Sequence, residues 1–116
     1  MSSHALIKSA LSAHAGLAAL VGTRIRADLA EAEDDYPFVV FKRSGLQRIT
    51  GLDGSVHGQI ETFEIECWAD NRSQSVNVFE QALQALDAAG LVAEEGDPDG
   101  IDPELLQRVT VARVDI

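Results

Sequence analysis

The chain contains one cysteine, Cys67, and no apolar run approaches the ~20 residues that a membrane-spanning helix needs. A single cysteine excludes an intramolecular disulfide framework and fits a reducing compartment. The first residues, from Met1 to His4, place no charged region ahead of a hydrophobic stretch, so we expect no signal peptide. These absences favour a protein that is made in the cytoplasm and has no membrane partner.

Basic residues are also scarce. Nine Lys and Arg stand against 19 Asp and Glu, which gives a formal net charge of −10. A protein that holds nucleic acid through phosphate contacts needs a dense Lys/Arg patch, so this composition argues against that function. The 116 residues, 46% of them hydrophobic, are enough for one folded domain that covers residues 1–116.

The charges are unevenly placed along the chain. Lys42, Arg43 and Arg48 lie in a segment where Asp53 is the one opposing acid up to position 57. Two acidic blocks without basic residues flank this segment: Asp28, Glu31, Glu33, Asp34 and Asp35, and then Glu94, Glu95, Asp97, Asp99, Asp102 and Glu104. Such blocks are most often solvated loops. The alternative is that the basic segment meets an acidic block on a neighbouring copy.

Apolar residues at helical spacing predict two main helices. The first runs from His4 to Ala13 with a cap at Ser2 or Ser3, and a short further turn precedes Gly22. The second runs from about Arg72 to Ala89 after the cap residue Asn71, with Gly90 just past its end. Its predicted buried stripe consists of Val76, Phe79, Ala82, Leu83 and Leu86.

Four segments have the composition of strands: 24–29, 36–41, 60–68 and 108–116. Four glycines punctuate the segment between the second and third strands, so we expect residues 42–57 to be a long mobile arm rather than a tight hairpin, with a turn at 52–55. Residues 94–104 are rich in turn residues. We therefore expect an α+β domain in which two helices pack on one face of a mainly antiparallel sheet of about four strands. Its predicted core joins the stripe of the second helix to Phe38, Val40, Phe63, Ile65 and Cys67.

No constellation of residues supports catalysis or a cofactor. Cys67 lies near His57 and Asp70 in sequence, but its place on the apolar side of a strand predicts an inert thiol. Glu64 and Glu66 share the opposite side of that strand, about 7 Å apart, and are better explained as a solvent-facing pair. The acidic turns after Glu94 lack the spacing of a calcium loop, and the three histidines lack that of a zinc site. We expect no catalytic residue, cofactor or metal.

The order of the strands resembles one known family. Tyr36-Pro37-Phe38-Val39-Val40-Phe41, then a polar arm, then Phe63-Glu64-Ile65-Glu66-Cys67-Trp68-Ala69-Asp70 and a helix, is similar to the small tail-completion proteins of long-tailed bacteriophages and prophages. These proteins are also described as head–tail joining or tail terminator proteins. The turn Leu17-Ala18-Ala19-Leu20-Val21-Gly22 followed by Arg24-Ile25 adds to the resemblance, which runs from about Leu6 to Gly90.

The resemblance implies a structural protein and no enzyme. Members of this family are α+β subunits that form a ring, usually a hexamer. The ring caps the tail-tube protein and docks on the head connector, or adaptor, and DNA passes through it without specific binding. The implied locations are the host cytoplasm during assembly and then the head–tail junction of the virion.

Five residues are candidates for the subunit interface: Lys42, Arg43, Arg48, His57 and Trp68. The first four carry charge or a polar ring on the arm, and Trp68 is an aromatic on an otherwise polar strand face, which is typical of an interface anchor. Two other hypotheses remain open. One is an unrelated α+β binding or dimerisation module with an acidic partner surface, and the other is a small hydrolase that uses Cys67.

Overall fold

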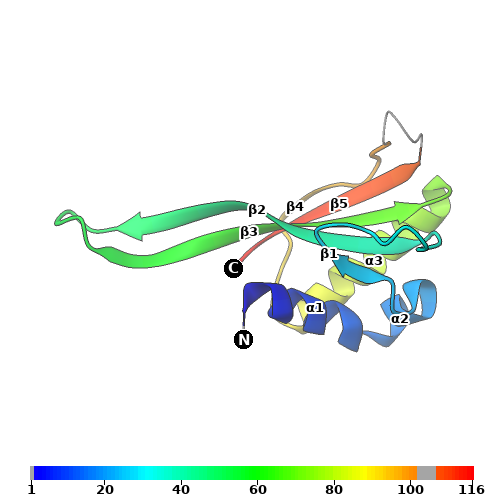
Figure 1. Cartoon of the computed structure of the whole chain (residues 1–116), viewed down its shortest axis with the longest axis horizontal. Helices are drawn as coiled ribbons and strands as arrows, with labels where there is room; N and C mark the ends of the chain where they lie inside the picture. The colour runs from blue at the N-terminus through cyan, green and yellow to red at the C-terminus, as the bar shows by residue number, and fades with distance from the viewer. Residues whose placement is uncertain (1, 102–106) are drawn as a thin grey trace.

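The computed structural model describes residues 2–101 and 107–116, and in these residues three helices cover one face of a five-stranded sheet (Figure 1). The α+β class is confirmed. The helices are α1 (Ser3–Ala13), α2 (Ala15–Val21) and α3 (Arg72–Ala88). The strands are β1 (Ile25–Ala27), β2 (Phe38–Thr50), β3 (Val56–Ala69), β4 (Glu95–Asp97) and β5 (Arg108–Asp115). The short turn expected before Gly22 is a separate helix, α2, and β4 was missed.

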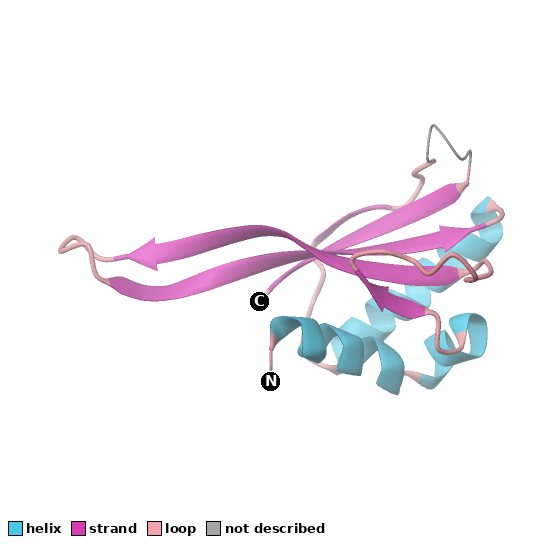
Figure 2. Ribbon diagram, in the orientation of Figure 1, coloured by secondary structure: helices cyan, strands magenta, loops and turns pink. Residues whose placement is uncertain are grey.

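The sheet has the strand order β1-β2-β3-β5-β4 (Figure 2). β1 pairs with β2 in parallel, and the other three pairs are antiparallel, as expected for a mainly antiparallel sheet. β4 gave no signal in the sequence because its three residues are all exposed. A side chain at Gly96 would place its Cβ 2.5 Å from the carbonyl oxygen of Val111, so glycine is required where β4 lies against β5.

Side chains cap the N-termini of α1 and α3, as the sequence predicts. The Ser2 hydroxyl accepts a hydrogen bond from the amide of Ala5 at 3.1 Å, and the Asn71 side chain accepts one from the amide of Gln74 at 2.8 Å. The Gln74 side chain accepts from the amide of Asp70, one residue before the position that a capping box uses. Among the described helices, none alone is long and apolar enough to cross a membrane. α1 and α2 together have that composition but are bent by 87°.

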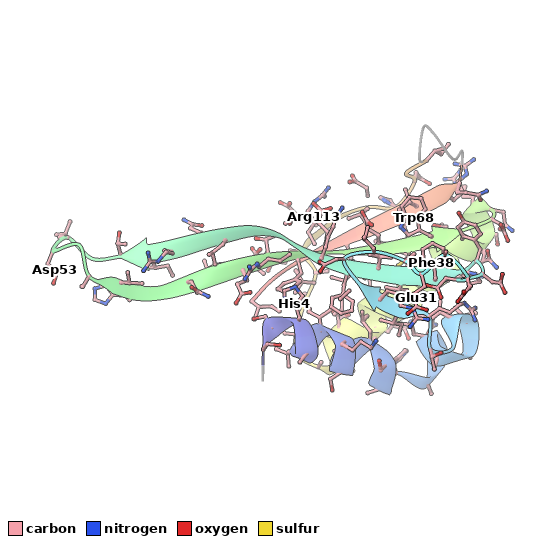
Figure 3. The ribbon with its side chains drawn as sticks, viewed as in Figure 1. His4, Glu31, Phe38, Asp53, Trp68 and Arg113 are labelled. Atoms are coloured by element: carbon pink, nitrogen blue, oxygen red, sulfur yellow. The ribbon has the colours of Figure 1, made fainter. Side chains whose placement is uncertain are left out.

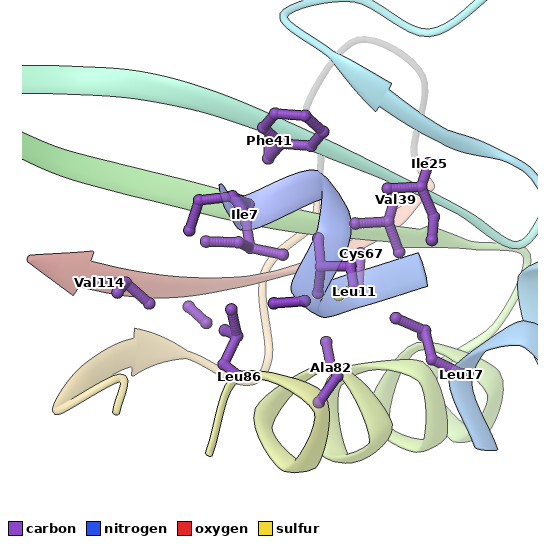
Figure 4. Packing of buried hydrophobic residues seen from close by; sticks show 14 of the residues in the cluster. Ile7, Leu11, Leu17, Ile25, Val39, Phe41, Cys67, Ala82, Leu86 and Val114 are labelled. Atoms are coloured by element: carbon purple, nitrogen blue, oxygen red, sulfur yellow. The ribbon is translucent and has the colours of Figure 1, made fainter. Parts of the chain in front are cut away.

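The core lies between the sheet and the helices (Figure 4). Val39 pairs with Cys67 and Phe41 with Ile65, and these four side chains face the helices. The prediction that Phe38 and Val40 belong to this core was wrong. They are buried on the other face of the sheet. The run from Phe38 to Phe41 is apolar at every position, so it has no polar residues that would show which side of the strand faces solvent. Only the pairing with β3 decides which of its residues face inward.

The buried face of α3 also differs from the predicted one. Ala82 and Leu86 are buried as expected, but Val76, Phe79 and Leu83 are only partly buried. The other buried residues of the helix are Ser75, Val78 and Ala85. Small side chains bring α3 close to the sheet, and the hydroxyl of Ser75 is satisfied by the carbonyl of Cys67 and the hydroxyl of Thr110, each at 3.4 Å.

The predicted arm is an antiparallel hairpin. β2 and β3 remain paired from Phe38 opposite Trp68 out to Thr50 opposite Val56, with irregularities at Arg43/Gly45 and Ile49/Thr50. The expectation of an arm without tight pairing was wrong, because backbone pairing continues past the glycines. The turn expected at 52–55 is present. The hairpin extends well beyond the helices and gives the molecule a longest dimension of 51 Å (Figure 1).

Candidate interaction surfaces

The outer part of the hairpin, which we call the distal arm (residues 44–59), is covered by no other element (Figure 1). It contains one Arg and one Asp, so its formal charge is zero in a chain of net charge −10. Seven large hydrophobic side chains are exposed in the described residues, and four of them lie on the distal arm: Leu46, Ile49, Leu52 and Val56. The distal arm therefore combines exposed apolar side chains with an absence of net charge.

Hydrogen bonds within the hairpin turn hold the tip in one shape. The carboxylate of Asp53 accepts from the amide of Ser55 at 3.0 Å and from its hydroxyl at 2.6 Å, and these bonds lower the pKa of Asp53. The Ser55 hydroxyl also lies 3.2 Å from Nε2 of His57. Gly54 has φ +81°, a conformation that favours glycine. Leu52 takes no part in this network and is fully exposed at the tip.

Two of the predicted basic interface residues are paired within the chain. Lys42 lies 3.1 Å from the carboxylate of Glu66, and Arg43 lies 3.3 Å from that of Glu61. The Ser3 hydroxyl and then Arg43 lower the pKa of Glu61. The sequence missed these pairs because the acids lie about twenty positions away and become neighbours only through strand pairing. Arg48 forms no ion pair with any described residue.

Trp68 lies on the sheet face away from the helices, in an aromatic stack (Figure 3). Its ring is 6.1 Å from that of Phe38 at an interplanar angle of 16°, and Phe38 stacks on Tyr36 at 5.1 Å. These rings line an open apolar hollow of about 190 Å³, which we call the Trp68 hollow, together with Asp28, Leu29, Ala30, Val40 and Glu66. The sequence pointed to Trp68 but not to Leu29 or Tyr36, whose places depend on how the loop after β1 folds back.

Arg26 holds the loop between β1 and β2 against the packed part of the molecule outside the distal arm, which we call the body. The guanidinium donates to both carboxylate oxygens of Asp34, at 3.0 and 3.1 Å, and lies 3.4 Å from Glu31. The hydrogen bond from Arg26 is the main reason that the pKa of Asp34 lies below its usual value. The other acids of the loop, Asp28, Glu33 and Asp35, form no ion pair with described residues, and of these three Asp28 lines the Trp68 hollow.

The second acidic block is partly neutralised within the chain. Asp97 lies 2.8 Å from Arg113, and the hydrogen bond between them raises the pKa of Arg113. Asp99 lies 2.7 Å from Arg72. Asp102 and Glu104 lie outside the described residues, so the structure says nothing of their part in this block.

The residues considered for catalysis are kept apart. Cys67 is fully buried, and burial raises the pKa of its thiol to about 12. His57 lies near the arm tip beside Ser55. Glu64 forms an ion pair with Arg113, and Glu66 forms one with Lys42.

The other two histidines make contacts within the fold. His4 packs edge-on against Phe63, and His14 contacts the side chain of Gln81 at 3.0 Å. The described residues contain no group of three or more His, Cys, Asp or Glu that could hold a metal ion.

Comparisons with known proteins agree with the predicted resemblance. The family described as "Tail completion protein gp17" matches residues 5–113. Among solved structures, a chain of the "Virion of native gene transfer agent (GTA) particle" has a similar fold, with a TM-score of 0.65. The two sequences are 19% identical, and the similarity covers 99% of this chain and 96% of the other. No curated protein matches.

Proposed function

This chain belongs to the tail completion protein gp17 family, and from that premise we propose that it forms a ring that caps the tail tube and joins it to the head connector. At a coarser level it is a structural phage tail protein. The single observation that carries the proposal is the family match over residues 5–113. The partners are further copies of this chain, the tail-tube protein and the head connector. Assembly takes place in the host cytoplasm, and the product lies at the head–tail junction.

The shape of the molecule supports a role carried out through surfaces. An uncovered hairpin projects from a packed body, and an uncovered hairpin gains contacts only from another chain. The five candidate interface residues fall into two groups in the structure. Lys42, Arg43, Arg48 and His57 lie along the hairpin, whereas Trp68 lies on the body. A subunit with two separate contact regions suits a head-to-tail ring, in which each copy meets two neighbours through different faces.

The charge supports passage of DNA without binding. Six copies at −10 each carry −60. A lumen of negative potential repels phosphates, so a genome can slide through it without adhering. The same charge opposes association of the subunits at low ionic strength, where the Debye length is about 30 Å at 0.01 M and screening is weak.

Localisation on the particle tests the proposed function. Gold-labelled antibody against the chain, viewed by electron microscopy on tails that lack heads, should mark the head-proximal end of the tube. Particles made without this chain should be separate heads and tails, and adding the purified protein to the separate tails and heads should restore joining. Label along the tube or at the distal end would contradict the proposal.

The mass of the purified protein in solution gives a second test. Sedimentation should show mainly monomer at low salt and low concentration, and association into a ring should increase with ionic strength as the repulsion is screened. A dimer that persists at every salt concentration would instead favour the dimerisation module, in which an acidic face meets a basic partner.

A further inference from the structure

We propose that the tip of the distal arm of one copy docks in the Trp68 hollow of the next copy, with Leu52 as its apolar anchor. This inference rests on the proposed ring and names the surfaces that close it. The occupant of the hollow is therefore a second copy of this chain.

The apolar surfaces of the two sites are complementary. The hollow is lined by stacked aromatic rings, and Leu29 at its edge is 80% exposed. The tip presents Leu52, with Ile49 and Val56 about half exposed behind it. A hollow of about 190 Å³ has room for a leucine side chain. Docking removes both apolar surfaces from water, which is the main favourable contribution to association.

The distribution of charge favours this contact over others between copies. The distal arm has a formal charge of zero, whereas the hollow is lined by Asp28, which forms no ion pair with described residues, and Glu33 and Asp35 belong to the same loop between β1 and β2. Residues 1–23 also lack acids, but of the seven exposed large hydrophobic side chains in the described part of the chain none lies there. The distal arm is thus the region that can approach an acidic neighbour without repulsion and still bury apolar surface. Arg48, four residues before Leu52, brings a positive charge toward this acidic loop.

The geometry prevents a copy from filling its own hollow. Asp53 marks the arm tip at one end of the 51 Å molecule, while Phe38 and Trp68 lie on the body toward the other end (Figure 3). The paired backbone of β2 and β3 keeps the tip away from the body. The contact must therefore join different copies, and because the tip and the hollow are different surfaces it can repeat from copy to copy and close into a ring.

Disulfide trapping between two variants that each gain one cysteine tests the contact. Leu52→Cys and Leu29→Cys both replace exposed side chains, and the native Cys67 is buried. One variant carries a mass tag, so that the mixed dimer can be told from either homodimer on a non-reducing gel. We expect mild oxidation of the mixture to give mainly the mixed dimer. The double variant should give a ladder that ends at the ring size. The matched control, Ser12→Cys on the exposed surface of α1 with Leu52→Cys, should give little cross-linked product.

A charge at the tip gives an independent test. Leu52→Asp should weaken association by about tenfold or more, as expected when a charge enters an apolar contact, while the melting temperature of the monomer stays unchanged. Leu52→Met should associate like the parent. If rings form but no Leu52–Leu29 product appears and Leu52→Asp assembles normally, the docking inference is wrong and the ring stands. If no association occurs at any salt or protein concentration, the inference and the ring are both wrong.

Discussion

β2 and β3 pass through two different environments in this molecule. Over the body, Val39, Phe41, Phe63 and Ile65 face the helices and are completely or almost completely buried, and the other sheet face is partly covered by the loop after β1. Along the distal arm the same two strands continue with neither face covered by another element. The backbone pairing is similar in both parts, but the burial of side chains is not. The difference indicates that the body supplies the stability of the fold and that the distal arm is available for contacts with other chains.

Removal of most of the distal arm should have the largest effect on assembly and one of the smallest on folding. Gln47 lies directly opposite Ile60, so residues 48–59 can be replaced by an Asn-Gly turn that joins the strands. We expect the monomer to unfold at nearly the parent temperature, because the deleted residues bury no core side chain. Ring formation should be lost in sedimentation. A shortened protein that unfolds much more easily would show that the arm also stabilises the body.

The converse change is a cavity in the body. Phe63→Ala should lower the free energy of unfolding by about 3 to 5 kcal/mol, because it empties a fully buried aromatic site against α1. Leu52→Ala at the arm tip is the matched control and should stay within about 0.5 kcal/mol of the parent. Denaturant unfolding of both monomers measures the contrast. Similar losses in the two variants would contradict the division of roles.

Arg43 and Arg48 make a finer comparison within the hairpin. Arg43 is paired with Glu61 at the base, whereas Arg48 forms no ion pair with described residues. We expect Arg48→Glu to weaken ring formation at every salt concentration with no change in melting temperature. Arg43→Glu should cost the monomer less than about 1 kcal/mol, since exposed ion pairs contribute little. Equal assembly by Arg48→Glu and the parent would mean that Arg48 is only a solvated residue.

The pH dependence of stability should show the smallest effect. The pKa of Asp34 is lowered in the folded body, mainly by its hydrogen bond from Arg26. Its stabilising contribution is therefore present above the unfolded pKa of about 3.9 and is lost as the pH falls through the folded value. Asp34→Asn should melt at a lower temperature than the parent at pH 7, and the two melting curves should converge below about pH 4. A constant difference between the curves at every pH would contradict this linkage.

Most element types were predictable from local pattern. α1 and α3 have apolar residues at helical spacing and good cap residues, and β3 has a clean alternation, so Phe63, Ile65 and Cys67 were correctly expected to face inward. The buried face of α3 was harder to predict, because three of its five buried residues are Ser75, Ala82 and Ala85, whose small side chains carry little hydrophobic signal. Phe79 lies at the edge of the packing instead of its centre.

The sequence by itself determined the α+β class, the family resemblance, the acidic charge and the inert environment of Cys67, because these follow from composition and from residues close together in the chain. Only the tertiary structure decided which face of β2 is buried, that the arm is a paired hairpin, and that Lys42 and Arg43 are neutralised by Glu66 and Glu61. It also formed the Trp68 hollow from Leu29, Tyr36 and Phe38. These features depend on strand register and on a loop folding back, which bring distant residues together, and no local pattern contains that information.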